Sequence, residues 1–129
     1  MKITLLLLAI FIFFTQNHVA AQSNNTLVKN DEYIIKPVPP GGENAFRNYI
    51  YENLTYPEEA KKHNIKGRVY LQFTVTQEGE IKDIYVIKGL GYGCDGEAVR
   101  LLKGSGLWAP ARIAGNKKDM KMLYTIEFH

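Results

Sequence analysis

The chain has 129 residues, of which 46% are hydrophobic and 22% are charged, and its formal net charge is +3 at pH 7. This length indicates one domain, and the composition is that of a globular chain. The basic side chains are scattered along the sequence, which argues against a nucleic-acid partner. A single cysteine, Cys94, excludes an internal disulfide.

The N-terminus has the layout of a secretory signal peptide. A positive start at Met1–Lys2 is followed by an apolar run from Ile3 to Phe14 with Thr4 as its one polar residue, and Val19–Ala21 offers the small residues of a cleavage site. A transmembrane helix needs about 20 consecutive apolar residues, and this run is shorter. The sequence therefore predicts that residues 1–21 are removed on export to the periplasm. The alternative is an uncleaved anchor in the inner membrane, with the domain facing the periplasm.

Residues 22–42 predict a flexible lead-in. They begin with polar, Asn-rich sequence, and Glu32–Lys36 could form a short strand. The prolines and glycines of Pro37–Gly42 stop any regular element from continuing. We therefore place the start of the folded domain at residue 43, so that the domain covers residues 43–129.

Two helices are predicted before the first long strand. From Glu43 onward, apolar residues recur at the spacing of one buried helix face, namely Phe46, Tyr49, Ile50 and Leu54. A second, short helix is predicted over Tyr56–His63. Pro57 suits its first turn, and acidic residues precede basic ones as the helix dipole favours.

A change to period two then predicts a hairpin. Arg68–Val75 alternates apolar and polar residues, and the apolar ones are Val69, Leu71, Phe73 and Val75. Gly79 makes the turn, and Ile81–Lys88 is the return strand. We expect Ile84 and Val86 on its core face, with a bulge near Ile81, whose parity differs.

A third helix and a last strand complete the order. Asp95 can cap this helix through its side chain, and the predicted buried residues are Ala98, Leu101 and Leu102. After a turn at Gly115–Asn116, Met120–Phe128 alternates as a strand with one buried face. This order predicts an α+β fold in which helices pack on one face of an antiparallel sheet.

The supply of catalytic groups is small. A cysteine nucleophile needs a nearby base, and Cys94 with His63 or His129 is the only such combination. Cys94 stands near a helix start, which would lower its pKa. No cysteine and histidine, and no pair of histidines, has the spacing of metal ligands. We expect no enzyme activity and no cofactor; the alternative is a thiol enzyme that uses Cys94.

Several of these features recur together in a known family. In chain order the motifs are Pro40-Gly41-Gly42, Tyr56-Pro57-x-x-Ala60, Gly67-Arg68-Val69, Phe73-x-Val75, Gly79-x-Ile81, Gly91-x-Gly93-Cys94-Asp95-x-Glu97-Ala98, Lys103, Trp108-x-Pro110, Gly115 and Phe128. The ordered set resembles the TonB C-terminal domain, in the form found in Bacteroidota. The resemblance runs from about Glu32 to the C-terminus.

The resemblance implies a fold and a mode of binding. The fold is an antiparallel sheet with two helices packed on one face, to which this chain adds an N-terminal helix. The implied partner is an outer-membrane TonB-dependent transporter or another envelope protein. An extended segment of that partner would pair with the last strand by strand addition, linked to energised transmembrane transport. The implied partner-binding residues are Lys121, Met122, Leu123, Tyr124, Thr125, Ile126, Glu127 and, before the Tyr-Pro motif, Asn53.

Three points stay open at this stage. The same strand edge could pair with a second copy and give a homodimer. Energy-transducing members resemble a rod with a retained anchor and a long spacer, whereas residues 22–42 span at most about 70–75 Å when fully extended. The identity of the partner and of the transported substrate is not encoded in any motif here. Neither a small-molecule substrate nor a nucleic acid is expected.

Overall fold

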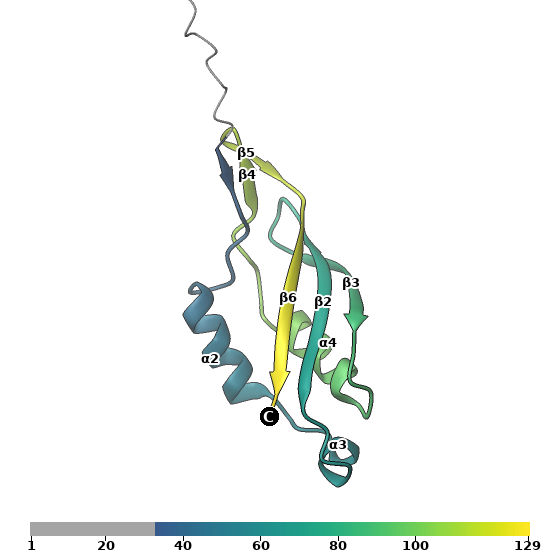
Figure 1. The fold of residues 1–129 in the computed structure, drawn as a ribbon. Helices are drawn as coiled ribbons and strands as arrows, with labels where there is room; N and C mark the ends of the chain where they lie inside the picture. Colours follow the sequence, from purple (N-terminus) through teal and green to yellow (C-terminus); the bar gives the residue numbers. More distant parts are fainter. Residues whose placement is uncertain (1–32) are drawn as a thin grey trace, which may run out of the picture. The chain divides into compact units, whose positions relative to one another are not determined.

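The structure, a computed structural model, describes residues 33–129 (Figure 1). The predicted signal peptide and the polar part of the lead-in lie outside the described residues. Within residues 33–129, no helix is long and apolar enough to cross a membrane. The elements are β1 (Ile34–Ile35), α2 (Glu43–Asn53), α3 (Glu58–Lys62), β2 (Gly67–Val75), β3 (Ile81–Lys88), α4 (Cys94–Lys103), β4 (Ala111–Ile113), β5 (Asn116–Lys118) and β6 (Met120–Phe128).

The main sheet has three antiparallel strands in the order β3-β2-β6, with β2 in the centre. The predicted core face of β2 is confirmed, because Val69, Leu71, Phe73 and Val75 are all fully buried. β6 pairs with β2 along its whole length, from Gly67 opposite Phe128 to Val75 opposite Met120. Its even-numbered residues face the core as predicted, with Ile126 and Phe128 the most deeply buried.

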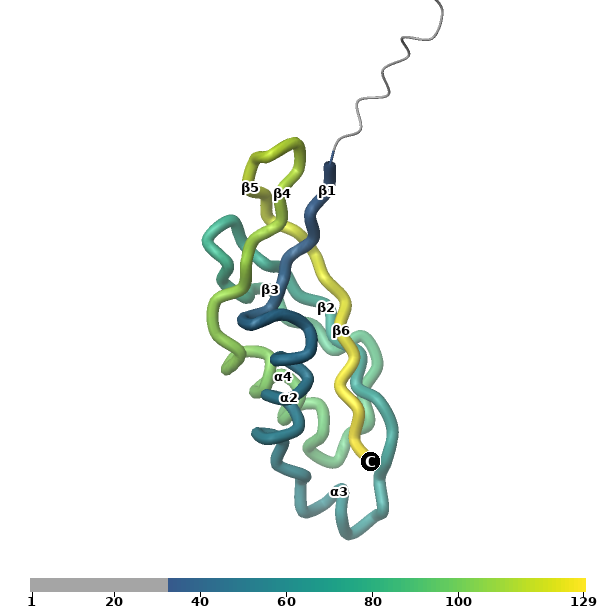
Figure 2. Tube along the Cα trace, turned by 90° about the vertical axis from the view of Figure 1, so that its left-hand side faces the viewer, coloured from purple at the N-terminus to yellow at the C-terminus, as the bar shows by residue number. Residues whose placement is uncertain are grey.

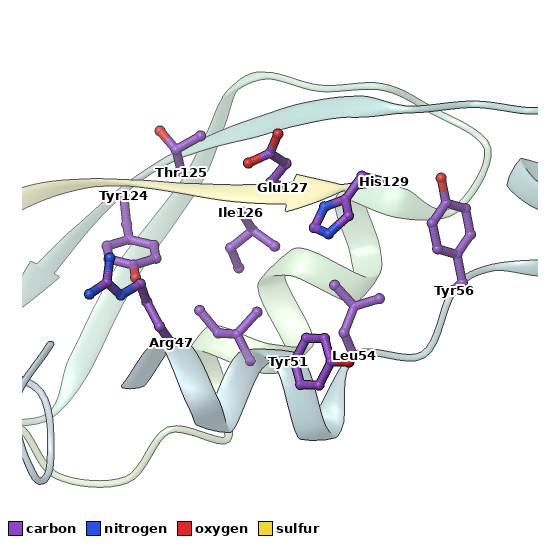
Figure 3. A pocket seen from close by; sticks show the side chains of 10 residues that line it. Arg47, Tyr51, Leu54, Tyr56, Tyr124, Thr125, Ile126, Glu127 and His129 are labelled. Atoms are coloured by element: carbon purple, nitrogen blue, oxygen red, sulfur yellow. The ribbon is translucent and has the colours of Figure 1, made fainter. Parts of the chain in front are cut away.

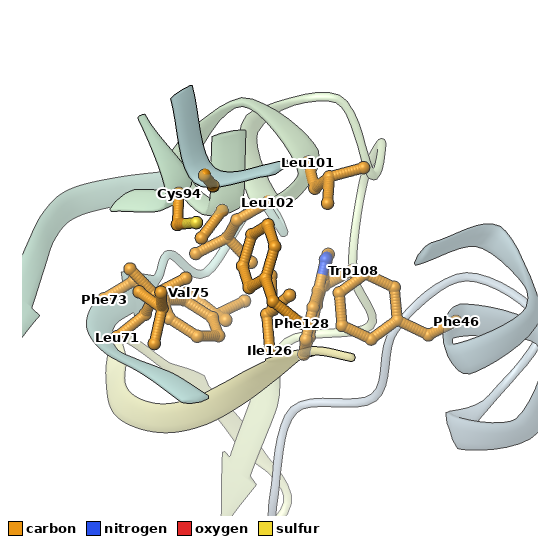
Figure 4. Close-up of a cluster of buried hydrophobic side chains, with 13 residues drawn as sticks. Phe46, Leu71, Phe73, Val75, Cys94, Leu101, Leu102, Trp108, Ile126 and Phe128 are labelled. Carbon is orange, nitrogen blue, oxygen red and sulfur yellow. The ribbon is translucent and has the colours of Figure 1, made fainter. Parts of the chain in front are cut away.

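Helices α2 and α4 cover the same face of this sheet (Figure 2). Phe46 of α2 and Leu101 and Leu102 of α4 join one buried cluster with Ile126 and Phe128 of β6 (Figure 4). The Tyr49 hydroxyl donates to the Leu101 carbonyl at 3.0 Å and ties the two helices together. The predicted α+β fold, with helices packed on one face of an antiparallel sheet, is confirmed. The additional N-terminal helix is itself one of the helices on that face.

A second small sheet, in the order β1-β4-β5, was not predicted as a separate unit. Ala114 and Gly115 both adopt positive φ and turn β4 into β5. Ile34 of β1 pairs with Ile113 of β4, and Val38 forms an isolated bridge with Ala109. The strand expected within Glu32–Lys36 therefore forms over two residues, and the segment after it contacts the domain.

Strand β3 departs from simple alternation because two register shifts interrupt its pairing with β2. Asp83 has a φ of 51° at one of them. As a result, Ile81 and Ile84 both pack against the core although they are three residues apart. Val86 is 38% exposed, so the prediction that it belongs to the core is wrong. Val86 lies opposite the buried Leu71 and so faces the same side of the sheet, but β3 is an edge strand and leaves this side chain partly open to solvent.

The predicted capping role of Asp95 is also wrong. Helix α4 follows Gly93, whose φ is 86°, and its start has no side-chain cap. Asp95 Oδ1 instead accepts hydrogen bonds from the backbone N–H groups of Leu90, at 2.8 Å, and Gly91, at 3.3 Å. A Cβ at Gly89 would lie 2.2 Å from this carboxylate, so the close approach requires glycine. Asp95 thus fixes the loop before α4.

Candidate functional site

The strand order places β6 at one edge of the main sheet, and the predicted residues Lys121–Glu127 all lie on it. Alternate residues of an edge strand turn their N–H and C=O groups away from the sheet. Within residues 33–129, the recorded backbone hydrogen bonds of β6 run only to β2. The outer side of β6 is therefore an open row of donors and acceptors.

The other edge of the sheet, β3, is much less suited to pairing. Its two register shifts bend the strand and break the regular spacing of its outward groups. Bulges are one way in which proteins protect an edge from unwanted pairing. β6 instead keeps one register with β2 through nine consecutive pairs. Of the two edges, β6 offers the longer regular template.

A groove of about 380 Å³ runs between β6 and helix α2 (Figure 3). We call it the α2–β6 groove. In Figure 3, Arg47 lies beside Tyr124 at one end, and His129 and Tyr56 lie at the other. Its lining residues are Arg47, Ile50, Tyr51, Leu54, Tyr56, Tyr124, Thr125, Ile126, Glu127 and His129.

Aromatic packing holds α2 beside β6. The Phe46 ring lies 5.2 Å from the Trp108 ring, edge to face, and 4.9 Å from the Tyr124 ring. The Tyr124 hydroxyl donates to Glu43 Oε1 at 3.0 Å, at the start of the helix. Burial, and then this carboxylate, raise the pKa of Tyr124. The phenol therefore stays protonated at neutral pH and remains a donor to Glu43.

Asn53, the other predicted site residue, does not line the groove. Its side-chain amide donates back to the Tyr49 carbonyl at 2.8 Å, and its own carbonyl accepts from Arg100 at 2.8 Å. Its neighbour Leu54 is the residue of this segment that faces the groove. The structure thus brings Lys121–Glu127 together on one edge and gives the Asn53 side chain a local role at the end of α2.

The contribution of α2 to the site was missed from the sequence. Arg47 and Tyr51 follow the i, i+4 spacing of one helix face, next to the predicted core face, and Leu54 of that core face follows directly after the last residue of α2. That spacing is a usable signal, but it does not say which strand the face approaches. We call Arg47, Ile50, Tyr51 and Leu54 the outer stripe of α2.

An ion pair within α4 holds the end of α2 and the segment after it through backbone hydrogen bonds. Arg100 donates to both carboxylate oxygens of Glu97, at 2.6 and 2.8 Å. The backbone N–H of Thr55 also donates to Glu97, at 2.8 Å. The Arg100 guanidinium is the main cause that lowers the pKa of Glu97. This arrangement positions Thr55 directly before the Tyr-Pro motif.

Cys94 does not have the surroundings of a nucleophile. It is the first residue of α4, and its side chain is fully buried in the core. Burial, and then the nearby Asp95 carboxylate, raise the pKa of the thiol. The expectation that the helix start would lower this pKa is therefore wrong. Across residues 33–129, no three His, Cys, Asp or Glu side chains gather as metal ligands.

Comparisons with known proteins identify the family of this chain. A family model for the Gram-negative bacterial TonB protein C-terminal region matches residues 52–129. No curated protein matches the chain. Among solved structures, the chain is similar to the NMR solution structure of the Helicobacter pylori TonB C-terminal domain, with 22% sequence identity and a TM-score of 0.48, over 69% of this chain and 84% of that one. Because the family match spans more than half of the sequence, the protein belongs to the TonB C-terminal domain family.

Proposed function

We propose that this protein is a periplasmic binding domain that recognises an extended segment of a partner by strand addition to β6. The proposed partner is an outer-membrane TonB-dependent transporter or another envelope protein, and binding would serve energised transmembrane transport. Family membership supports a TonB-like role. The observation that carries the proposal is the open, regular edge of β6.

The chemistry of such an edge is simple. Alternate residues of β6 offer one N–H and one C=O each to a chain laid alongside. A typical hydrogen bond in water contributes only about 0.5–1.5 kcal/mol net, and ordering a flexible segment opposes binding. Main-chain pairing alone would therefore give modest affinity and little sequence preference. This protein needs no catalytic group for that task, and a buried Cys94 fits a structural role.

Export completes the proposal. The predicted signal peptide, residues 1–21, would deliver the domain to the periplasm, where it meets transporters of the outer membrane. A membrane-anchored transducer that keeps this segment is the alternative. The mass of the protein recovered from the periplasmic fraction separates the two, because cleavage after Ala21 removes 21 residues. An intact N-terminus in the membrane fraction would favour the anchored form.

Strand addition is tested by amide NMR on the purified exported protein. Peptides with the N-terminal sequences of outer-membrane transporters from the same cell are titrated in, and chemical shifts and hydrogen exchange are followed. We expect saturable shifts over Lys121–Glu127, with slower exchange at alternate β6 amides that were unprotected before. The amides of Ile81–Lys88 provide the internal control, since the bulged edge should not respond.

The same experiment distinguishes the competing occupants of the edge. Shifts of β6 amides that depend on protein concentration, in the absence of peptide, would show self-pairing into a homodimer. A folded monomer whose β6 amides respond to no transporter or envelope peptide would contradict strand addition. Shifts confined to β3 would show that the wrong edge has been assigned.

A further inference from the structure

The outer stripe of α2 lines the α2–β6 groove, and two of its members, Arg47 and Tyr51, are exposed. Tyr51 is 83% exposed although it is a large aromatic residue, and Leu54 is half-buried. Exposed apolar side chains that line one hollow indicate a contact surface more strongly than scattered ones do. The family match begins at residue 52, so most of α2 precedes it. The groove is thus built from a matched strand and a helix that lies mainly outside the match.

Charge at one end of the groove is unbalanced. Arg47 is exposed and lines the groove, and its guanidinium donates to Asn44 within the same helix. Within residues 33–129, no carboxylate lies within ion-pair distance of Arg47. Glu43, four residues before Arg47 on the same helix, accepts the hydrogen bond of Tyr124 and does not line the groove. Arg47 therefore presents a positive charge to whatever enters beside Tyr124.

The position of this charge relative to β6 follows from the strand geometry. Residues directly opposite each other on paired strands point their side chains to the same face. Tyr124 and Ile126 point toward α2, whereas Thr125 and Glu127 lie on the opposite side of the strand (Figure 3). A strand added to β6 would therefore send alternate side chains into the groove. One would lie level with Ile126 and the next level with Tyr124 and Arg47.

We infer that the α2–β6 groove selects the sequence of the strand that pairs with β6. The occupant is an extended partner segment with an apolar side chain opposite Ile126 and an acidic side chain opposite Tyr124, two residues away. The apolar side chain packs against Tyr51 and Leu54, and the acidic one pairs with Arg47. An antiparallel strand carries the pattern apolar-x-acidic from N to C, and a parallel strand carries its reverse. This inference rests on the proposed strand addition and adds the specificity that main-chain pairing lacks.

The test selects peptides without assuming a partner. A library of random nine-residue peptides displayed on phage is panned against the purified protein, and enriched peptides are kept if they shift β6 amides. Three variants are panned in parallel: Arg47→Glu, Tyr51→Ala and the control Lys118→Glu. Lys118 is exposed on β5, outside the groove. Its replacement by glutamate makes the same change of charge as Arg47→Glu. Arg47 and Tyr51 are exposed, so their replacement should leave the fold intact.

We expect the wild type and the Lys118→Glu variant to enrich the same apolar and acidic pair. Arg47→Glu should weaken a wild-type-selected peptide roughly tenfold, because an attraction becomes a repulsion, and a lysine in place of the peptide's acid should restore much of the loss. The library panned on this variant should select a basic residue at that position. Tyr51→Ala should weaken the apolar contact and leave the acidic preference in place.

Three outcomes would overturn the inference, and they can be told apart. If peptides shift β6 amides equally in the wild type and Arg47→Glu, with no acidic position, strand addition stands and groove selection fails. If no peptide shifts β6 amides in any form, strand addition itself fails. If β6 amides respond only to protein concentration, the occupant is a second copy of this chain.

Discussion

Replacing Phe46 with alanine tests whether α2 is an integral part of the domain. The Phe46 side chain is almost fully buried and contacts the Trp108 and Tyr124 rings. Phe-to-Ala changes at such positions cost about 3–5 kcal/mol of unfolding free energy, because transfer energy is lost and a cavity remains. Since alanine favours helix more than phenylalanine, the loss cannot come from helix propensity. A domain of this size has about 5–15 kcal/mol in total, so the variant should fold only marginally.

The assay is urea denaturation followed by tryptophan fluorescence and circular dichroism. Trp108 is the only tryptophan in the sequence and lies against Phe46, so its emission reports directly on this contact. The matched control is Tyr51→Ala on the same helix, which also removes an aromatic ring but an exposed one. Its effect should stay within about 0.5 kcal/mol. Equal losses for the two variants would refute the packing of α2 on the sheet.

Three further predictions concern the frame around the site. Gly79→Ala should lower the free energy of unfolding by about 2 kcal/mol or more, because the new Cβ would lie 2.1 Å from the Trp108 carbonyl oxygen. Gly115→Ala has open space around its Cβ and should lower it by about 1 kcal/mol. Thermal denaturation of the two variants compares these losses. Glu97→Gln should lower the free energy of unfolding by about 1.5 kcal/mol at pH 7, because the charged carboxylate loses its hydrogen bonds. The folded protein lowers the pKa of Glu97 below 4.5, so the stability that this carboxylate adds is lost as the pH falls through that lowered pKa. Urea titrations of both proteins across this pH range measure the difference. The Cys94 thiol should react with a thiol reagent slowly in the native protein and rapidly in urea; fast native labelling would contradict its burial.

The periodic elements could be predicted from the sequence because their signal is local. Alternation over Arg68–Val75 and Met120–Phe128 shows which side chains are buried, since a strand turns successive residues to opposite faces. The spacing of Phe46, Tyr49 and Ile50 likewise identifies the packed face of α2. The ordered motifs identified the family, which the match over residues 52–129 confirms.

Local patterns failed where a side chain or strand has a choice of neighbours. Asp95 has the side chain of a helix cap, but it lies inside the first turn of α4 and accepts from two N–H groups of the loop before the helix. Val86 has the right parity for the core and lies opposite the buried Leu71, but its strand is at the edge of the sheet and the side chain stays 38% exposed. Neither outcome is visible in the sequence, because each depends on groups that the fold brings into reach.

The sequence by itself determined the helices, the long strands with the buried faces of β2 and β6, and the family. Only the tertiary structure decided which strand lies at the edge and what stands beside it. Periodicity does not say whether β6 lies in the centre or at an edge of the sheet, and the order β3-β2-β6 places it at an edge. The groove joins Arg47, Tyr51 and Leu54 to residues of β6 more than 60 positions later in the chain. Periodicity reports that a face is apolar, whereas long-range packing decides which surface that face meets.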